Sequence, residues 1–275
     1  MIPELLNRHW GFDPVDVTAL EGGMNSLTWS VRSDTARWVG KAVPAHAAEA
    51  FAYGLGLADR LERAGIAAGA PEPTLDGRWT APLGERTFAL LRWVEGEEPE
   101  EQAVVGRTLA RAHLVLGTAE PGRLYLPEEH LDIRPWLRPM AEGVMRLLDA
   151  AALTWGPVHG DPSMDAFRLD PATGRCGVID WGGAGVWPRA YDLAALVMYE
   201  GPARMRPLID AYIAEGALAR EEMERALGPL LDYRWAGQAV YFAGRIARGD
   251  VTGLWSPDAN EEGLEAARRW FHPNG

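Results

Sequence analysis

The sequence predicts an α+β protein of two lobes: a small N-terminal lobe around an antiparallel sheet, and a larger lobe that is mainly helical. Three observations predict this class. Short runs of β-forming residues dominate the first third of the chain, and runs with helical apolar spacing dominate the rest. Between them, residues 95–101 break the pattern with Gly, Pro and charge. We place the boundary there, with lobes over residues 1–95 and 96–275.

The N-terminal lobe is predicted to begin with a short amphipathic helix and its exit, within residues 1–20. A glycine turn at Gly22 and Gly23 then leads into a strand, because Leu27, Trp29 and Val31 alternate along the chain. The other predicted elements are a strand over residues 38–43, a helix over residues 45–64, and a hairpin with strands at 79–83 and 87–94.

The C-terminal lobe is predicted to be helical apart from one hairpin. Two short strands, at residues 167–169 and 177–179, are joined by a turn of sequence DPATG. Composition and apolar spacing predict helices from Tyr191 onward and in the first part of the lobe. The individual predictions are residues 103–116, 134–152, 203–215, 220–233 and 236–248.

Charge and composition limit the possible function classes. The chain has 275 residues and a net charge of -12, which disfavours duplex nucleic acid because that partner needs clustered cations. An acidic surface fits a cationic ligand or plain solubility. The single cysteine, Cys176, fits a reducing compartment. The N-terminus lacks the features of a secretory signal, and no apolar stretch is long enough for a membrane span. We expect a cytoplasmic protein.

The residues that carry chemistry lie between Val158 and Asp192. His159-Gly160-Asp161 is followed by Ile179-Asp180-Trp181-Gly182 and then by Ala190-Tyr191-Asp192. The predicted hairpin would bring Asp161 and Asp180 to one end of a small sheet. Phosphoryl transfer needs such a pair, because one carboxylate orients the acceptor hydroxyl while the other holds a metal ion against the phosphates.

These paired motifs resemble the aminoglycoside phosphotransferase superfamily, which includes choline kinases and related small-molecule kinases. The resemblance covers the chain from about Gly22 to about Tyr199. It implies a bilobal protein-kinase-like fold that uses ATP and Mg²⁺. It also implies an acceptor hydroxyl on a small molecule, such as an aminoglycoside-like compound, or on a peptide Ser or Thr. Antibiotic resistance and natural-product biosynthesis are both open as biological roles.

The resemblance also assigns roles to individual residues. Asp161 matches the catalytic aspartate, and His159 is expected to orient the same loop rather than to act as a base. Asp180 matches the metal-binding aspartate, and Asp192 matches an aspartate that braces the catalytic loop. The nucleotide would be held by Lys41 on the third strand, by the turn with Gly22, Gly23 and Asn25, and by a hinge over residues 91–94 that includes Leu91 and Trp93.

Lys41 is singled out by composition as well as by position. It is the only lysine in a chain whose other basic residues, apart from histidine, are arginines. It sits on the strand where a phosphate-binding lysine is expected, and arginine is a poor replacement for a compact ammonium group. Kinases orient this lysine with a glutamate on the following helix. Glu49 is the best candidate for that partner.

One position departs from the family pattern. The catalytic loop of the family ends with an Asn that binds the metal, and this chain has Ala166 there. The neighbouring Asp165 has a hard oxygen ligand suited to Mg²⁺. Three interpretations stay open: a single metal on Asp180, a second ligand moved to Asp165, or a pseudokinase that binds nucleotide and acts as a scaffold or partner-binding module. Retention of Asp161, Asp180 and Lys41 together favours an active enzyme.

The acceptor site is the least defined part of the prediction. Trp235 and Tyr241 could line it, because aromatic side chains often meet cationic or peptide ligands. Acidic side chains in the C-terminal lobe could hold a cationic acceptor. The candidates are Glu200, Asp232 and Asp250.

Overall fold

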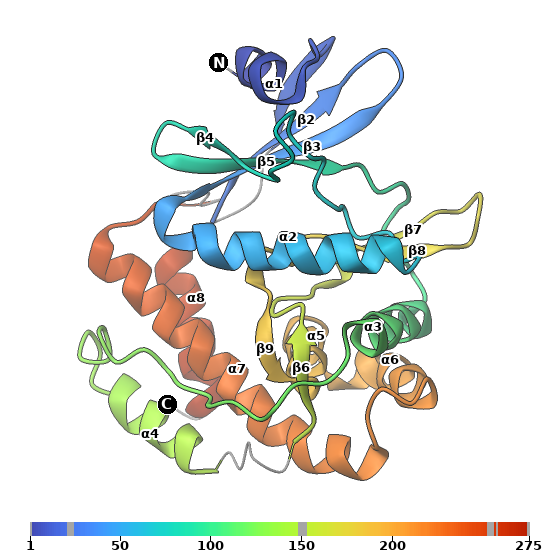
Figure 1. Cartoon of the computed structure of the whole chain (residues 1–275). Coiled ribbons are helices and arrows are strands. Elements are labelled where there is room, and N and C mark those ends of the chain that lie inside the picture. Colours follow the sequence, from blue (N-terminus) through green and yellow to red (C-terminus); the bar gives the residue numbers. More distant parts are fainter. Residues whose placement is uncertain (1, 21–24, 148–152, 252–255, 257, 274–275) are drawn as a thin grey trace.

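The computed structural model describes residues 2–20, 25–147, 153–251, 256 and 258–273. A sheet-rich lobe lies at the top of Figure 1 and a helical lobe lies below it. This arrangement confirms the predicted α+β, bilobal class. No helix in the described ranges is long and apolar enough to cross a membrane.

The N-terminal lobe is a five-stranded antiparallel sheet with strand order β1-β2-β3-β5-β4. Strand β1 was not predicted. None of its residues is fully buried in the structure, so it is not a strand with one clearly buried face. Lys41 lies on the central strand β3, opposite Thr28 on β2 and Ala89 on β5. With β1 counted, this is the third strand, as the resemblance implies. The strand bounds are β1 Asp16–Leu20, β2 Leu27–Arg32, β3 Arg37–Pro44, β4 Ala81–Leu83 and β5 Arg86–Arg92.

Two helices pack against this sheet. Helix α1 (Ile2–Trp10) buries Leu6 and Trp10, and the indole of Trp10 meets Phe88 edge to face at 5.5 Å. Helix α2 (Ala48–Arg63) follows a short 3₁₀ turn (Ala45–Ala47) and runs between the sheet and the helical lobe (Figure 1). It ends before Gly65, whose φ of 85° is the left-handed conformation in which many helices end.

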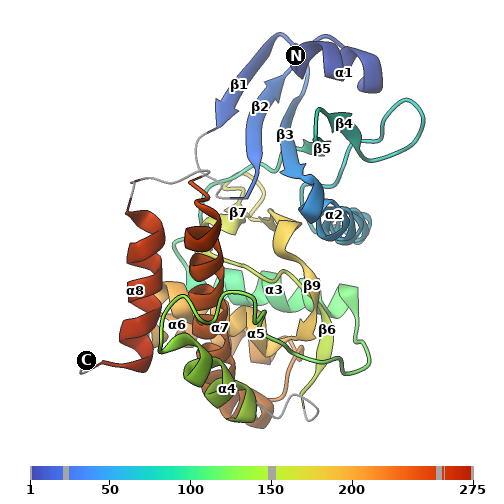
Figure 2. The same cartoon turned by 90° about the vertical axis from the view of Figure 1, so that its left-hand side faces the viewer.

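The C-terminal lobe packs its helices around one large apolar core. Figure 2 shows α7 and α8 side by side below the sheet. Two small antiparallel sheets, β6–β9 and β7–β8, carry the loops of the site. The helices are α3 Gln102–Leu116, α4 Leu137–Leu147, α5 Ala190–Glu200, α6 Pro202–Ala214, α7 Arg220–Arg248 and α8 Ala259–Phe271. The strands are β6 Trp155–Val158, β7 Phe167–Leu169, β8 Cys176–Val178 and β9 Gly185–Pro188.

The structure corrects several predicted bounds. The predicted helices at residues 220–233 and 236–248 form one helix, α7, because no breaking residue separates them. The helix predicted over 134–152 starts at Leu137 and is described as far as Leu147. Strands β6 and β9 were not predicted, because each is only four residues long and contains both glycine and proline.

The segment between the lobes runs from β5 to α3. Glu97 pairs with Leu169 of β7 through two backbone hydrogen bonds of 3.1 and 2.7 Å, so this connection is anchored to the helical lobe. The predicted boundary between residues 95 and 96 falls in this segment and stays a prediction.

Candidate active site

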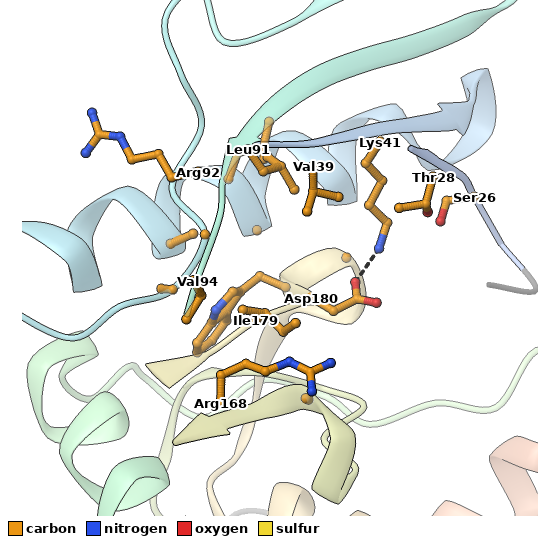
Figure 3. Close-up of a pocket in the computed structure, with 18 of the residues that line it drawn as sticks. Ser26, Thr28, Val39, Lys41, Leu91, Arg92, Val94, Arg168, Ile179 and Asp180 are labelled. Atoms are coloured by element: carbon orange, nitrogen blue, oxygen red, sulfur yellow. Dashed lines mark hydrogen bonds and ion pairs between the residues drawn. The ribbon is translucent and has the colours of Figure 1, made fainter. Parts of the chain in front are cut away.

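A cleft of about 580 Å³ lies between the sheet and the helical lobe. Figure 3 shows side chains of both lobes facing each other across it. Its roof comes from β2, β3 and β5, and its floor from β7 and the loop after β8. Six of the predicted site residues line it: Lys41, Leu91, Trp93, Asp161, Asp165 and Asp180.

Lys41 and Asp180 form an ion pair across the cleft, between Lys41 Nζ and Asp180 Oδ1 (Figure 3). The Lys41 side chain is largely buried, whereas the Asp180 side chain is 59% exposed. The expected partner, Glu49, is exposed in the first turn of α2. The ion pair in this structure is therefore the one with Asp180, and the expected pairing with Glu49 is not formed.

Asp180 is held in an unusual backbone conformation. Among the described residues it is the non-glycine residue with a positive φ, at 66°. A left-handed backbone costs about 1 kcal/mol for most L-residues, although Asp and Asn tolerate it best. Burial in the cleft acts to raise the pKa of Asp180, but the charge and hydrogen bond of Lys41, together with His159 and the Gly182 N–H, hold the pKa below its ordinary value. The carboxylate is therefore ionised and directed into the cleft.

The loop that carries Asp161 is fixed by its neighbours in sequence. Gly160 has a φ of 87°, and a Cβ there would overlap the carbonyl oxygen of Gly183. The His159 ring is buried, with Nε2 2.8 Å from the carbonyl oxygen of Ile179. A carbonyl can only accept, so Nε2 is the donor. The Asp161 backbone N–H lies 3.4 Å from His159 Nδ1. Both ring nitrogens are engaged, which fits the expected orienting role.

Asp192 anchors the same loop from below. Its side chain is fully buried, and its two oxygens accept hydrogen bonds of 2.8 Å from the backbone N–H groups of His159 and Gly160. His113 Nε2 adds a contact of 3.0 Å. Burial acts to raise the pKa of Asp192, but the hydrogen bond and charge of His113 help to hold it below its ordinary value. The bracing role expected for Asp192 agrees with these contacts.

Asp161 has two partners that the sequence did not reveal. Arg234 on α7 forms an ion pair with Oδ1 of Asp161, and the Tyr199 hydroxyl donates to the same oxygen at 2.7 Å. Arg234 also donates to Tyr199 at 2.9 Å and to Tyr191 at 3.2 Å. Burial raises the pKa of Tyr199, so its hydroxyl keeps the proton that it donates. Oδ2 of Asp161 takes no part in these bonds, and Asp161 lines the cleft.

The donors present fit one metal ion better than two. Asp180 presents an ionised carboxylate at the cleft, which suits Mg²⁺. Ala166 is buried and offers a methyl group where a second ligand is expected. Asp165 lines the cleft, but Ser163 donates a hydrogen bond to its Oδ1. In the described ranges no group of three or more His, Cys, Asp or Glu side chains could hold a metal by itself.

The expected nucleotide contacts are partly described. Leu91 and Trp93 line the cleft at the hinge, and Arg37 lies 3.9 Å from the ring centroid of Trp93. Asn25 accepts a hydrogen bond of 2.9 Å from Tyr241 on α7, which links the segment before β2 to the helical lobe. Gly22 and Gly23 lie outside the described residues.

The acidic side chains expected to hold a cationic acceptor are engaged elsewhere. Glu200 pairs with Arg204 at 2.7 Å, Asp250 pairs with Arg245 at 3.4 Å, and Asp232 accepts from the Trp270 indole at 2.9 Å. Trp235 stacks on Trp270 with ring centroids 5.7 Å apart. Of the two aromatic candidates, it is Tyr241 that reaches the upper lobe.

Comparison with solved structures supports the kinase-like fold. An amicoumacin kinase in complex with AMP-PNP, Ca²⁺ and Ami superposes with a TM-score of 0.73 at 13% identity, covering 100% of this chain and 93% of that one. A microcompartment-associated aminopropanol kinase gives 0.70 at 16% identity, with coverage of 100% and 98%. An aminoglycoside phosphotransferase in complex with GDP and kanamycin gives 0.67 at 14% identity, covering 98% of both chains.

Sequence comparison gives the family. No curated protein matched the chain significantly. The model of the phosphotransferase enzyme family matches residues 16–229, which include β1, the cleft and most of the helical lobe. This match confirms the resemblance drawn from the three motifs and the expectation of a phosphotransferase. The chain belongs to the phosphotransferase enzyme family.

Proposed function

We propose that this protein transfers the γ-phosphate of ATP, with Mg²⁺, to a hydroxyl group of a small molecule. The observation that carries the proposal is the joint placement of Lys41, Asp180 and Asp161 in one cleft between the lobes. Each has the charge that phosphoryl transfer needs, and each comes from a different element.

Nucleotide binding is supported by both ends of the cleft. At one end, Leu91 and Trp93 provide an apolar hinge where a base can lie. At the other, Lys41 is poised to meet phosphate oxygens once they compete for its ammonium group. The relatives were solved with AMP-PNP and with GDP, so we take ATP as the first nucleotide to test and GTP as the second.

The chemical step uses the free oxygen of Asp161. The acceptor hydroxyl oxygen forms a bond to the γ-phosphorus while the bond to the β–γ bridging oxygen breaks and ADP leaves. The hydroxyl proton moves to Asp161 Oδ2. Arg234 and Tyr199 hold Oδ1, which fixes the direction in which Oδ2 points. A divalent metal on Asp180 would supply charge neutralisation for the phosphates.

The acceptor is proposed to be a small-molecule hydroxyl compound, because the relatives named above act on small molecules or are bound to them. A peptide Ser or Thr presents the same reacting group and is a second acceptor class to test. Ala166 supports one competing function, a nucleotide-binding pseudokinase that serves as a scaffold.

Calorimetric titration of AMP-PNP, with and without Mg²⁺, tests the proposal on the wild type and on Asp180→Ala. Asp34→Ala is a matched control, because Asp34 is an exposed carboxylate in the β2–β3 loop. We expect Mg²⁺ to strengthen binding in the wild type and in the control but not in Asp180→Ala. Phosphorus NMR with ATP and a panel of hydroxyl compounds then detects transfer.

The outcomes separate the two functions. Mg²⁺-dependent binding with transfer to at least one acceptor supports the enzyme. Binding that is indifferent to Mg²⁺, with no transfer to any small molecule or peptide, supports the pseudokinase. Absence of nucleotide binding contradicts both.

A further inference from the structure

Arg168 enters the cleft from its floor. It lies on β7 after Phe167, whose side chain is fully buried in the helical lobe, so the alternation of the strand directs Arg168 to the opposite face. The Arg168 side chain is half-buried and lines the cleft together with Lys41 and Asp180. Figure 3 shows it running along the floor, with its guanidinium group toward Asp180.

The other charged groups of the cleft have partners. Lys41 pairs with Asp180, and Asp161 pairs with Arg234. Arg92, at the rim, pairs with Glu72 at 3.1 Å. Among the residues that the structure describes, none makes an ion pair or a hydrogen bond with the side chain of Arg168.

A half-buried cation without a counterion indicates an anionic ligand. Removing part of its hydration costs free energy, and a bound anion recovers this cost. A guanidinium group keeps its charge at physiological pH and binds phosphate oxygens through two parallel hydrogen bonds. The end of the cleft toward which it extends is marked by Lys41 and Asp180, where the phosphates of a nucleotide would lie.

Ala166 lies two residues before Arg168. Protein kinases hold two metal ions against the phosphates, one through the aspartate after the hairpin and one through a catalytic-loop asparagine. Here the second position carries a methyl group, and the backbone carbonyl of Ala166 accepts a hydrogen bond of 2.8 Å from Ile179 N–H. Part of the positive charge expected from a second metal is therefore missing, and Arg168 brings a fixed positive charge to the same floor.

We propose that Arg168 binds the phosphates of the nucleotide and takes the place of the second metal ion. The inference rests on the proposed function, since it assigns a residue to the same nucleotide. It makes the protein a one-metal phosphotransferase in which the second cation is part of the chain.

Binding of a ligand series tests the contact with phosphate. Adenosine, ADP and AMP-PNP are titrated calorimetrically into the wild type and Arg168→Met, with Arg175→Met as a control because Arg175 is exposed in the adjoining turn. We expect Arg168→Met to weaken AMP-PNP and ADP at least about tenfold and to leave adenosine unchanged. Equal weakening of all three ligands would show stacking on the base and would overturn the proposal, as would no change.

The number of bound metals tests the replacement. Electron paramagnetic resonance of Mn²⁺ with AMP-PNP is expected to count one ion per wild-type chain. In Ala166→Asn/Arg168→Met we expect a second ion, together with recovery of most of the lost AMP-PNP affinity. Two ions in the wild type, or a double variant that recovers no affinity while unfolding at the wild-type temperature, would contradict the replacement.

Failure of the proposed function gives a different result. If the wild type binds no AMP-PNP at all, both proposals fall. If the wild type binds AMP-PNP with Mg²⁺ and Arg168→Met does so equally well, the proposed function stands and only the role of Arg168 is lost.

Discussion

Two ion pairs meet at the cleft, and they differ in what holds them. The pair of Lys41 and Asp180 joins the two lobes and has a strained backbone on one side. The pair of Arg234 and Asp161 lies within the helical lobe, where Tyr199 bonds to both partners. The aspartates are similarly exposed, at 59% and 54%, so exposure does not separate them.

The difference lies in what each pair does when ligands arrive. Under the proposed function, phosphates and a metal would compete directly for Lys41 and Asp180, and that pair would be exchanged for ligand contacts. The Arg234 pair has no such competitor, because its partners are side chains of the same lobe. The residues of the first pair would thus become ligand contacts, whereas the second pair fixes the geometry of Asp161. The predictions below test this contrast from the largest expected effect to the smallest.

Asp161→Asn removes the proton acceptor and keeps the shape of the side chain. We expect turnover to fall by about 10²–10⁴-fold, the range found for general bases. The affinity for AMP-PNP should stay unchanged, because Asp161 has no part in the exchanged pair. Transfer rates and calorimetry measure the two effects. A matching loss of AMP-PNP affinity would show that the two pairs are not independent.

Asp192→Asn tests the anchor beneath Asp161. The substitution places an amide among three hydrogen-bond donors in a fully buried site. Removing one partner of a buried charged network costs about 3 kcal/mol or more, so the free energy of unfolding should fall by that amount. Urea unfolding at neutral pH measures it. A loss similar to that of an exposed substitution such as Asp34→Asn would contradict the anchoring role.

The same anchor predicts a pH dependence. The pKa of Asp192 in the folded protein lies below its ordinary value, which is about 3.9 for an unfolded chain. The ionised side chain therefore stabilises the fold above about pH 4, and this contribution is lost as the pH falls toward the folded pKa. Unfolding free energies measured from pH 7 to pH 3 should fall less steeply in Asp192→Asn than in the wild type.

Asp180→Asn keeps the tolerated left-handed backbone and removes the charge. We expect Mg²⁺-dependent AMP-PNP affinity to fall at least about tenfold, because the metal loses its main ligand. Without Mg²⁺ the affinity should rise, because Lys41 is released from its ion pair. Unchanged metal-free affinity would mean that the pair does not compete with the nucleotide. Asp180→Ala should lose the same charge and about 1 kcal/mol more stability from backbone strain.

Tyr199→Phe should have the smallest effect. It removes one of the two donors to Asp161 Oδ1 while Arg234 remains. A single hydrogen bond of this kind contributes about 1 kcal/mol, so turnover should fall about threefold to tenfold. The Michaelis constant for ATP should not change. A rise in that constant with turnover unchanged would place Tyr199 at the nucleotide instead.

The sequence predicted both residues of the exchanged pair, although not their pairing, and only Asp161 of the fixed pair. Lys41 and Asp180 stand in short motifs, and a lone lysine among arginines is a strong compositional signal. Arg234 lies in no recognised motif, and it is not a rare residue type, because arginine supplies nearly all the positive charge of the chain. Its partner Asp161 is distant in sequence and lies in the loop after β6, so only the tertiary packing of α7 brings the two together. The local sequence pattern also failed to predict that residues 220–248 form one continuous helix, in which Arg234 lies near the middle.

The secondary structure shows the same contrast between features with a local sequence signal and features that depend on distant neighbours. Strands with alternating residues and helices with apolar spacing were predicted, whereas β1, β6 and β9 depend on neighbours for their pairing. Glu49 shows the limit of analogy, because it occupies the expected helix but remains exposed at its first turn. Local propensity could not reveal which carboxylate the lysine would meet.

The close approach of Gly160 and Gly183 has a consequence for protein engineering. A side chain at position 160 has no room, because the carbonyl oxygen of Gly183 occupies the place of its Cβ. The segment around Asp161 and the turn after Asp180 therefore fit each other as a matched set. A chimaera that imports the first segment from a relative should import the second as well, because a mismatch at this contact would displace the loop that carries Asp161.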